Sequence, residues 1–72
     1  MQLGAYTDMN NAVVEQKNIK DNVSALLGYD FYIEQAVVNG VVYHRLMVKP
    51  EADKLQELCN QVIDAGFDCI LK

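Results

Sequence analysis

Residues 31–48 read FYIEQAVVNGVVYHRLMV, two apolar-rich runs on either side of Asn39-Gly40. Asn-Gly between such runs is the strongest short-range signal for a β-hairpin with a two-residue type I′ turn. A two-residue turn fixes the register of the strands, so Val38 pairs with Val41 and the pairing continues outward without a gap. The sequence therefore predicts a hairpin with strands at about 29–38 and 41–49.

This register assigns the side chains of the hairpin to two faces. One face receives four apolar side chains, those of the pairs Phe31–Val48 and Ile33–Leu46. The other face receives the pairs Tyr32–Met47, Glu34–Arg45 and Ala36–Tyr43. Because side chains alternate along a strand, a slip of one residue would bury Glu34 and Arg45. The first face suits a core, and the second is a candidate binding surface.

Size and composition indicate one small globular domain. The chain has 72 residues, near the lower limit for a fold without disulfides or metals. A hydrophobic fraction of 51% excludes a disordered tail. The net charge of −4 argues against a protein that binds the phosphates of nucleic acid. We expect residues 1–72 to form a single domain that contacts neither nucleic acid nor a membrane.

Helices and outer strands are expected on both sides of the hairpin. Residues 2–6 read as a strand, and residues 7–28 as a helix that starts with capping side chains and ends at Gly28 as a left-handed cap. Residues 50–66 read as a second helix with proline in its first turn and a glycine at its end. Residues 67–71 read as a last strand. The apolar stripes are Ala12, Gln16, Ile19, Val23 and Leu26 in the first helix and Ala52, Leu55, Leu58, Cys59, Val62 and Ile63 in the second.

The order β-α-β-β-α-β predicts an α+β fold of ferredoxin-like (split β-α-β) type. Each helix has a single apolar stripe, so both helices need an apolar sheet face as partner. The simplest solution is a four-stranded antiparallel sheet with two helices on one face. Right-handed crossovers place the first and third strands at the centre, with the second and fourth at the edges.

The sheet face away from the helices is the candidate binding surface. In the first strand Leu3 and Ala5 suit the core, so the remaining positions of that strand would lie on this face. Three of the four tyrosines would gather there beside amide and guanidinium groups, which suits sugars or unstacked bases. The acidic charge favours the sugar. The candidate ligand-binding residues are Gln2, Gly4, Tyr6, Tyr32, Tyr43, Arg45, Met47 and Ile70, with the carboxylates of Asp30, Glu34 and Asp68 on the same face.

The remaining reactive side chains indicate neither an enzyme nor a metal site. Cys59 and Cys69 are too far apart in sequence for a Cys-x-x-Cys pair, and the single histidine leaves no zinc ligand set. Two buried thiols are the favoured interpretation; a disulfide, which would imply an oxidising compartment, is the alternative. His44 faces the helices as a partly buried, hydrogen-bonded side chain without triad partners. A flat, solvated sheet does not offer the cleft between two carboxyls that a glycosidase needs. We expect no cofactor.

Four segments of the chain resemble the SPOR (sporulation-related repeat) domains. Residues 2–6, QLGAY, resemble the Gln-x-Gly-x-aromatic opening of that family, and Gly28-Tyr29 its Gly-aromatic entry to the second strand. Residues 44–50, HRLMVKP, resemble its Tyr-Arg-Val-x-Val-Gly-Pro segment, with Lys49 in place of the glycine. Residues 65–68, AGFD, resemble its closing Gly-aromatic step. The resemblance covers essentially the whole chain.

The resemblance implies a module that binds peptidoglycan. SPOR domains bind septal peptidoglycan, preferring glycan strands without stem peptides, on the helix-free face of the sheet. The residues that match the motif are Gln2, Tyr6 and Arg45. The implied location is the bacterial envelope, in the periplasm or cell wall at the division septum. We expect a monomeric module cut from a larger envelope protein.

Several alternatives remain open at this point. Arg45 either holds the lactyl carboxylate of a muramic acid unit or forms a cross-strand pair with Glu34. The fold also suits an ACT-like ligand-sensing or assembly module, which would be a dimer. An RRM-like binder of single-stranded nucleic acid is a further alternative, although the chain lacks the many lysines and arginines of that class.

Overall fold

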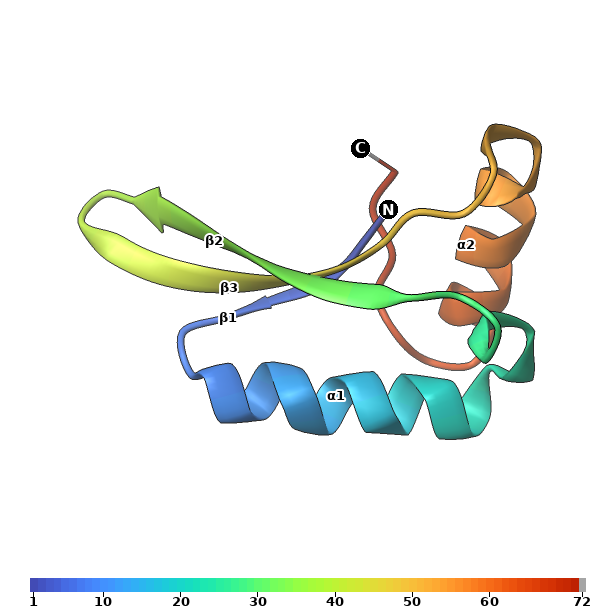
Figure 1. Cartoon of the computed structure of the whole chain (residues 1–72), viewed down its shortest axis with the longest axis horizontal. Coiled ribbons are helices and arrows are strands. Elements are labelled where there is room, and N and C mark those ends of the chain that lie inside the picture. The colour runs from blue at the N-terminus through green and yellow to red at the C-terminus, as the bar shows by residue number, and fades with distance from the viewer. Residues whose placement is uncertain (72) are drawn as a thin grey trace.

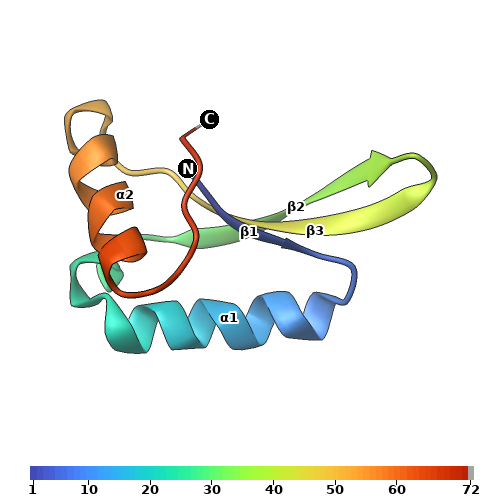
Figure 2. The same cartoon turned by 180° about the vertical axis from the view of Figure 1, so that it is seen from behind.

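A computed structural model gives the fold and describes residues 1–71. The strands are β1 (Gln2–Tyr6), β2 (Phe31–Val38) and β3 (Val41–Val48), and the helices are α1 (Met9–Asn22) and α2 (Leu55–Asp64). Short 3₁₀ turns, Ser24–Leu26 and Ala52–Lys54, follow α1 and precede α2. Helix α1 lies along one face of the sheet, and α2 stands across one end of it (Figure 1). The view from behind shows the same arrangement (Figure 2).

The hairpin is confirmed. Asn39 and Gly40 both have positive φ, 52° and 79°, as a type I′ turn requires. The pairing runs from Val38 opposite Val41 to Phe31 opposite Val48 without a shift. The assignment of the hairpin side chains to two faces is therefore correct.

Helix α1 begins as expected and ends early. The Asp8 side chain caps it by accepting a hydrogen bond from the Asn10 N–H at 2.8 Å. The helix ends at Asn22, where the chain tightens into a 3₁₀ turn that carries Leu26 into the core. The expected left-handed cap at Gly28 is wrong, because the turn ends the helix before that glycine. The expected cap at Gly66 is correct, since its φ is 93°.

The core lies between α1, α2 and the apolar face of β3. Leu46 and Val48 are fully buried, and the side chains packed with them are Met1, Leu3, Ile19, Val23, Leu26, Leu58, Cys59 and Val62. Ala52 and Ile63 of the expected second stripe are exposed. The stripe is narrower than predicted because the α-helix begins only at Leu55 and packs across the end of the sheet.

The structure shows an α+β fold whose sheet has three antiparallel strands in the order β1-β3-β2. The predicted fourth strand is not present in the described residues. Residues 67–71 meet β1 at one bridge, where Gln2 and Ile70 exchange two N–H···O hydrogen bonds of 2.8 Å. This bridge lies at the outer edge of β1, where the fourth strand was expected. The neighbouring Cys69 is bonded to α2, so a covalent link to the helix holds this segment more than strand pairing does.

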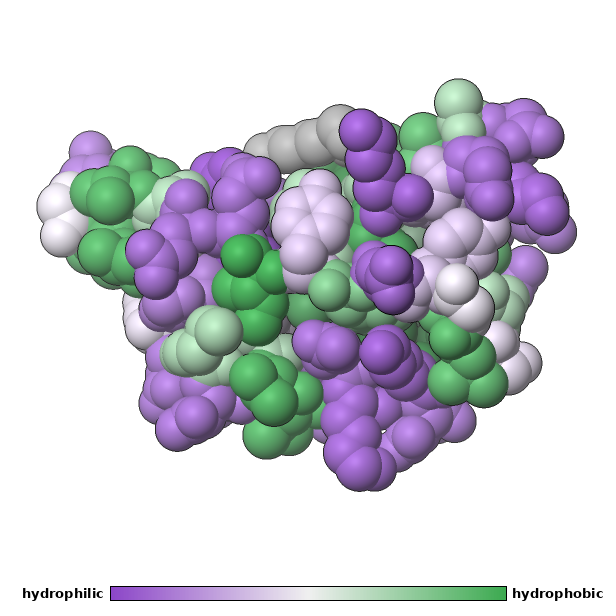
Figure 3. All heavy atoms as spheres, in the orientation of Figure 1, coloured by the Kyte–Doolittle hydropathy of each residue, from purple (hydrophilic) through white to green (hydrophobic). Residues whose placement is uncertain are grey.

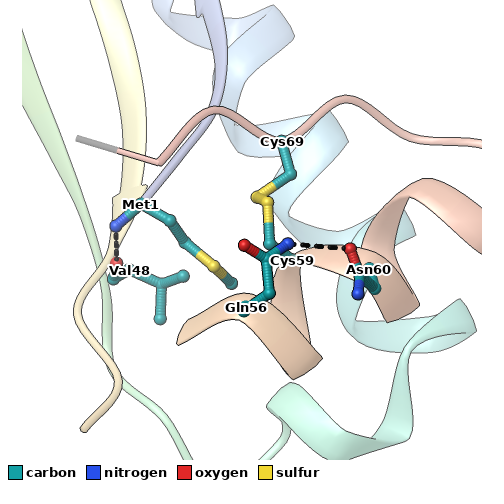
Figure 4. The surroundings of a disulfide bond; sticks show 6 residues. All are labelled: Met1, Val48, Gln56, Cys59, Asn60 and Cys69. Atoms are coloured by element: carbon teal, nitrogen blue, oxygen red, sulfur yellow. Dashed lines mark hydrogen bonds between the residues drawn. A yellow bond between two sulfur atoms is a disulfide. The ribbon is translucent and has the colours of Figure 1, made fainter. Parts of the chain in front are cut away.

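Cys59 of α2 and Cys69 form a disulfide, so the preferred interpretation of two buried thiols is wrong. Their Cα atoms lie 5.6 Å apart, within the range that a disulfide spans. The bond lies beside Met1 and Val48 at the end of the sheet (Figure 4). It fastens the C-terminal segment to a core that is small for an independent domain.

Removal of this disulfide is expected to lower the free energy of unfolding by about 2–3 kcal/mol, because it restores the loop-closure entropy of the unfolded chain. The bond joins residues separated by 10 positions. Urea unfolding of the double variant Cys59→Ala/Cys69→Ala measures the loss.

The control is the unmodified chain with and without a reductant. Reduction should lower its midpoint and leave the midpoint of the double variant unchanged. Equal midpoints for the oxidised and reduced unmodified chain would contradict the expectation.

Candidate functional site

A β-bulge decides which side chains of β1 reach the open face, the sheet surface opposite α1. Gln2 pairs with Met47, but Gly4 pairs with Leu46, so Leu3 has no partner of its own on β3. The extra residue inverts the alternation of side chains beyond it.

The bulge corrects the prediction for two residues. Tyr6 pairs with His44 and Gly4 pairs with Leu46, and both partners belong to the helix-facing side of β3. Ala5 takes the position on the open face instead, opposite Arg45. The expectation that Gly4 and Tyr6 lie on the open face is therefore wrong. It rested on strict alternation along β1, which the extra residue interrupts.

The ring of Tyr6 folds back over Gly4 on the helix side. A Cβ atom at Gly4 would overlap the Tyr6 hydroxyl and lie 2.7 Å from its Cζ. Tyr6 packs against the core, and burial raises the pKa of its hydroxyl, with a further contribution from the carboxylates of Glu15 and Asp68. Gly4 is thus required for the close approach of this ring.

The other predicted residues come together on the open face in transverse rows. The bridge and the two registers align the first row, which is Ile70, Gln2, Met47 and Tyr32. The second row is Ala5, Arg45 and Glu34. The third row is Tyr43 and Ala36. Tyr32 and Ile70 are 44% and 49% exposed, and Tyr43, Arg45 and Met47 are half-buried, so all five are accessible to a ligand.

The rings of Tyr32 and Tyr43 are widely spaced on the open face. Tyr43 lies opposite Ala36, and Ala36 is about 13 Å along β2 from Tyr32 at the usual rise of a strand. Arg45 lies between the rings. It faces Glu34 across the strands, but the two side chains form no ion pair in the described structure. The guanidinium is therefore available to an acidic or hydroxyl group of a ligand.

Gln2 carries a buried acceptor. The residue is 8% exposed, and its Oε1 has no hydrogen-bond partner among the described residues. An unpaired buried acceptor costs about 1–3 kcal/mol. The Nδ1 of His44, on the helix-facing side, is likewise buried without a partner. The expected hydrogen bond of His44 is thus not made at that atom.

A cleft of about 630 Å³ adjoins the open face at the base of the hairpin. Its lining residues are Gly28, Tyr29, Asp30, Tyr32, Lys49, Pro50, Glu51 and Ala52. Tyr32 belongs to both the cleft and the first row, so the two surfaces are continuous. None of the residues predicted from the sequence indicated this cleft, apart from Tyr32 and Asp30 on the adjoining face. Extending the hairpin register beyond Phe31 would have placed Asp30 opposite Lys49.

A hydrogen bond closes one wall of the cleft. The hydroxyl of Tyr29 donates to Oε2 of Glu51 at 2.6 Å. This bond raises the pKa of Tyr29 and lowers the pKa of Glu51, because it favours the protonated phenol and the ionised carboxylate.

Two kinds of feature are absent from the described part of the chain. Residues 1–71 hold no group of three histidine, cysteine or acidic side chains that could bind a metal ion. Neither of the helices in that range is long and apolar enough to span a bilayer.

Comparison with known proteins identifies the fold. No family model matches the chain, and no curated protein matches it in sequence. Among solved structures, the RlpA SPOR domain from Pseudomonas aeruginosa superimposes with a TM-score of 0.64 and 23% sequence identity. The match covers 89% of this chain and 82% of that chain. The chain has a SPOR-like fold. The resemblance carried by the four sequence segments is thereby confirmed at the level of the fold.

The residues of this SPOR-like domain that match the family motifs lie on both sides of the sheet. Gln2 of β1 and Arg45 of β3 lie on the open face, whereas Gly4 and Tyr6 of β1 pack on the helix side. Motif residues within one short strand thus lie on opposite sides of the sheet.

Gly4→Ala is expected to lower the free energy of unfolding of the SPOR-like domain by about 1–3 kcal/mol, because the new methyl group displaces the Tyr6 ring. In a Tyr6→Ala background the same substitution should cost much less. Urea unfolding of both single variants and the double variant measures the coupling. Strictly additive losses would contradict the close packing of these two residues.

The Tyr29–Glu51 bond should contribute to stability in a pH-dependent way. The pKa of Glu51 is lowered below its ordinary value of 4.5 in the folded state, so its contribution is present above 4.5 and is lost as the pH falls through the folded value. The melting temperature of Tyr29→Phe should lie below that of the unmodified chain at neutral pH. The difference should shrink in acid; a difference that does not change with pH would contradict this assignment.

Proposed function

We propose that this chain is a non-catalytic module that binds the glycan strands of peptidoglycan on its open face. The observation that carries the proposal is the placement of Tyr32, Arg45 and Tyr43 on the sheet face opposite α1. The SPOR-like fold and the four similar sequence segments support it.

Each side chain has a specific role in this proposal. The rings of Tyr32 and Tyr43 stack on the apolar faces of sugar rings, and their separation of about 13 Å favours an oligosaccharide over a single sugar. Gln2 donates its side-chain amide N–H to a sugar hydroxyl. Arg45 binds the lactyl carboxylate of a muramic acid unit through a charge-assisted hydrogen bond.

The shape of the open face favours modest affinity. A flat sheet surface removes less of a ligand from water than a deep pocket does. The cleft beside Tyr32 adds lining with both signs of charge, from Lys49 and Glu51, at one end of the surface. A glycan strand that continues past Tyr32 would enter it.

The cellular setting is part of the proposal. We infer a place in the bacterial envelope, in the periplasm or cell wall, as one module of a larger protein directed to the division septum. The Cys59–Cys69 disulfide agrees with an oxidising compartment outside the cytoplasm. Glycan strands without stem peptides are the preferred ligand in this proposal, as the sequence resemblance to SPOR domains implies.

The proposal is tested by co-sedimentation with purified cell-wall sacculi before and after an amidase removes the stem peptides. The unmodified chain should be retained, and more strongly after the treatment. Arg45→Ala and Tyr32→Ala/Tyr43→Ala should each weaken retention about tenfold or more, the effect of losing a dominant contact.

The matched control is Tyr6→Phe, which changes a tyrosine on the helix side of the same sheet. It should bind like the unmodified chain, and thermal unfolding should show that every variant is folded. Absence of retention of the unmodified chain, or equal retention of all variants, would end the proposal.

A further inference from the structure

The outer edge of β2 is an unpaired strand edge. The sheet order β1-β3-β2 leaves this strand with one neighbour. Residues beside a two-residue turn exchange hydrogen bonds with each other, so Val38 bonds to β3, and every second residue before it does the same. The N–H and C=O groups of Ile33, Gln35 and Val37 therefore point away from the sheet.

Most of the devices that normally protect a strand edge are missing here. Such edges usually carry lysine, proline or a bulge that prevents pairing with another chain. Phe31–Val38 has none of these: the strand has no cation, no proline and no shift of register with β3. Its one charged side chain is Glu34.

The end of the hairpin beside this edge is apolar and exposed. The side chains there are exposed by 42–69%, and they are Val37, Val38, Val41 and Val42. Figure 3 shows this end as a largely hydrophobic patch at the left of the molecule. Neither helix reaches it in Figure 1, since α1 and α2 lie toward the other end of the hairpin.

From these features we propose that β2 pairs antiparallel with β2 of a second copy of this chain. The two-fold axis lies midway between the two strands beside Gln35, so Gln35 faces its own counterpart. Ile33 then lies opposite Val37 of the second copy, and Tyr32 opposite Val38. Pairing extends over residues 32–38 of each copy.

Several registers would join the outward-pointing N–H and C=O groups of the two β2 strands. The charge of Glu34 and the number of paired residues favour the register centred on Gln35. A register centred on residue 34 would place Glu34 directly against Glu34 of the second copy, which is destabilising. Registers centred on 33 or 36 pair fewer residues, and the register centred on 33 leaves Val37 and Val38 unpaired. In the proposed register Glu34 faces Ala36, and Val37, the most exposed of the valines, gains Ile33 as a cross-strand neighbour.

The contact area predicts a weak, reversible dimer. One strand pairing of this length falls below the roughly 1,600 Å² that standard interfaces bury. Each copy carries a net charge of −4, so repulsion opposes association and added salt should strengthen it. This dimer replaces the monomer expected from the sequence.

Pairing through this axis makes one continuous sheet. Because the axis is perpendicular to the sheet, the open faces of both copies lie on the same side of it. Each copy then contributes its own Tyr32, Arg45 and Tyr43 to one continuous surface. That this continuous surface binds glycan rests on the proposed function. The pairing of the two β2 strands does not depend on it.

Sedimentation velocity over a wide range of concentrations tests the dimer. The unmodified chain should pass from monomer to dimer, at lower concentration in high salt. Val37→Lys should shift this transition to at least tenfold higher concentration. The matched control is Val42→Lys, on the adjacent β3 at the same end of the hairpin, which should change it less.

Cross-linking tests the register. Under a mild oxidant Gln35→Cys should form a covalent dimer, whereas Val37→Cys should form little, because residue 37 faces residue 33. A chain that stays monomeric at all concentrations, or equal cross-linking of the two variants, would overturn the inference. Sacculi binding is measured separately, so a monomer that still binds would leave the proposed function intact.

Discussion

The positive φ angles of Asn39 and Gly40 are the constraint on which the rest of the structure depends. They force a two-residue turn, and the turn fixes the pairing of β2 with β3. Strand β3 is the centre of the sheet, so the same register decides which of its side chains face α1 and which face outward. Insertion or deletion of one residue in that turn would move the side chains of one hairpin strand to the opposite face.

Local signals in the sequence predicted the parts of the fold that local chemistry decides. The hairpin register, the capping side chain at the start of the first helix and the glycine at the end of the second follow from a few neighbouring residues each, and all three are present. The positions of Tyr32, Tyr43 and Arg45 were therefore predictable as well. A SPOR-like fold could be inferred because four short segments along the chain resemble that family, and the structural match agrees with it.

Features that depend on distant partners could not be predicted in the same way. The bulge at Leu3 arises from how β1 meets β3, and nothing within residues 2–6 marks an extra residue. The disulfide depends on α2 bringing Cys59 next to Cys69, and the sequence spacing alone favoured two free thiols. The cleft beside Tyr32 forms where the chain leaves both strands of the hairpin, outside the elements that the pattern of apolar residues defines.

The bulge in β1 has a consequence for the comparison of related sequences. Within residues 2–6, Gly4 and Tyr6 pack on the helix side of the sheet, whereas Gln2 lies on the open face. Selection for stability would preserve the glycine and the aromatic ring even in a chain whose open face had changed completely. A relative that keeps this stretch can thus be assigned the architecture with good reason, while its ligand must be judged from the outward side chains of β2 and β3.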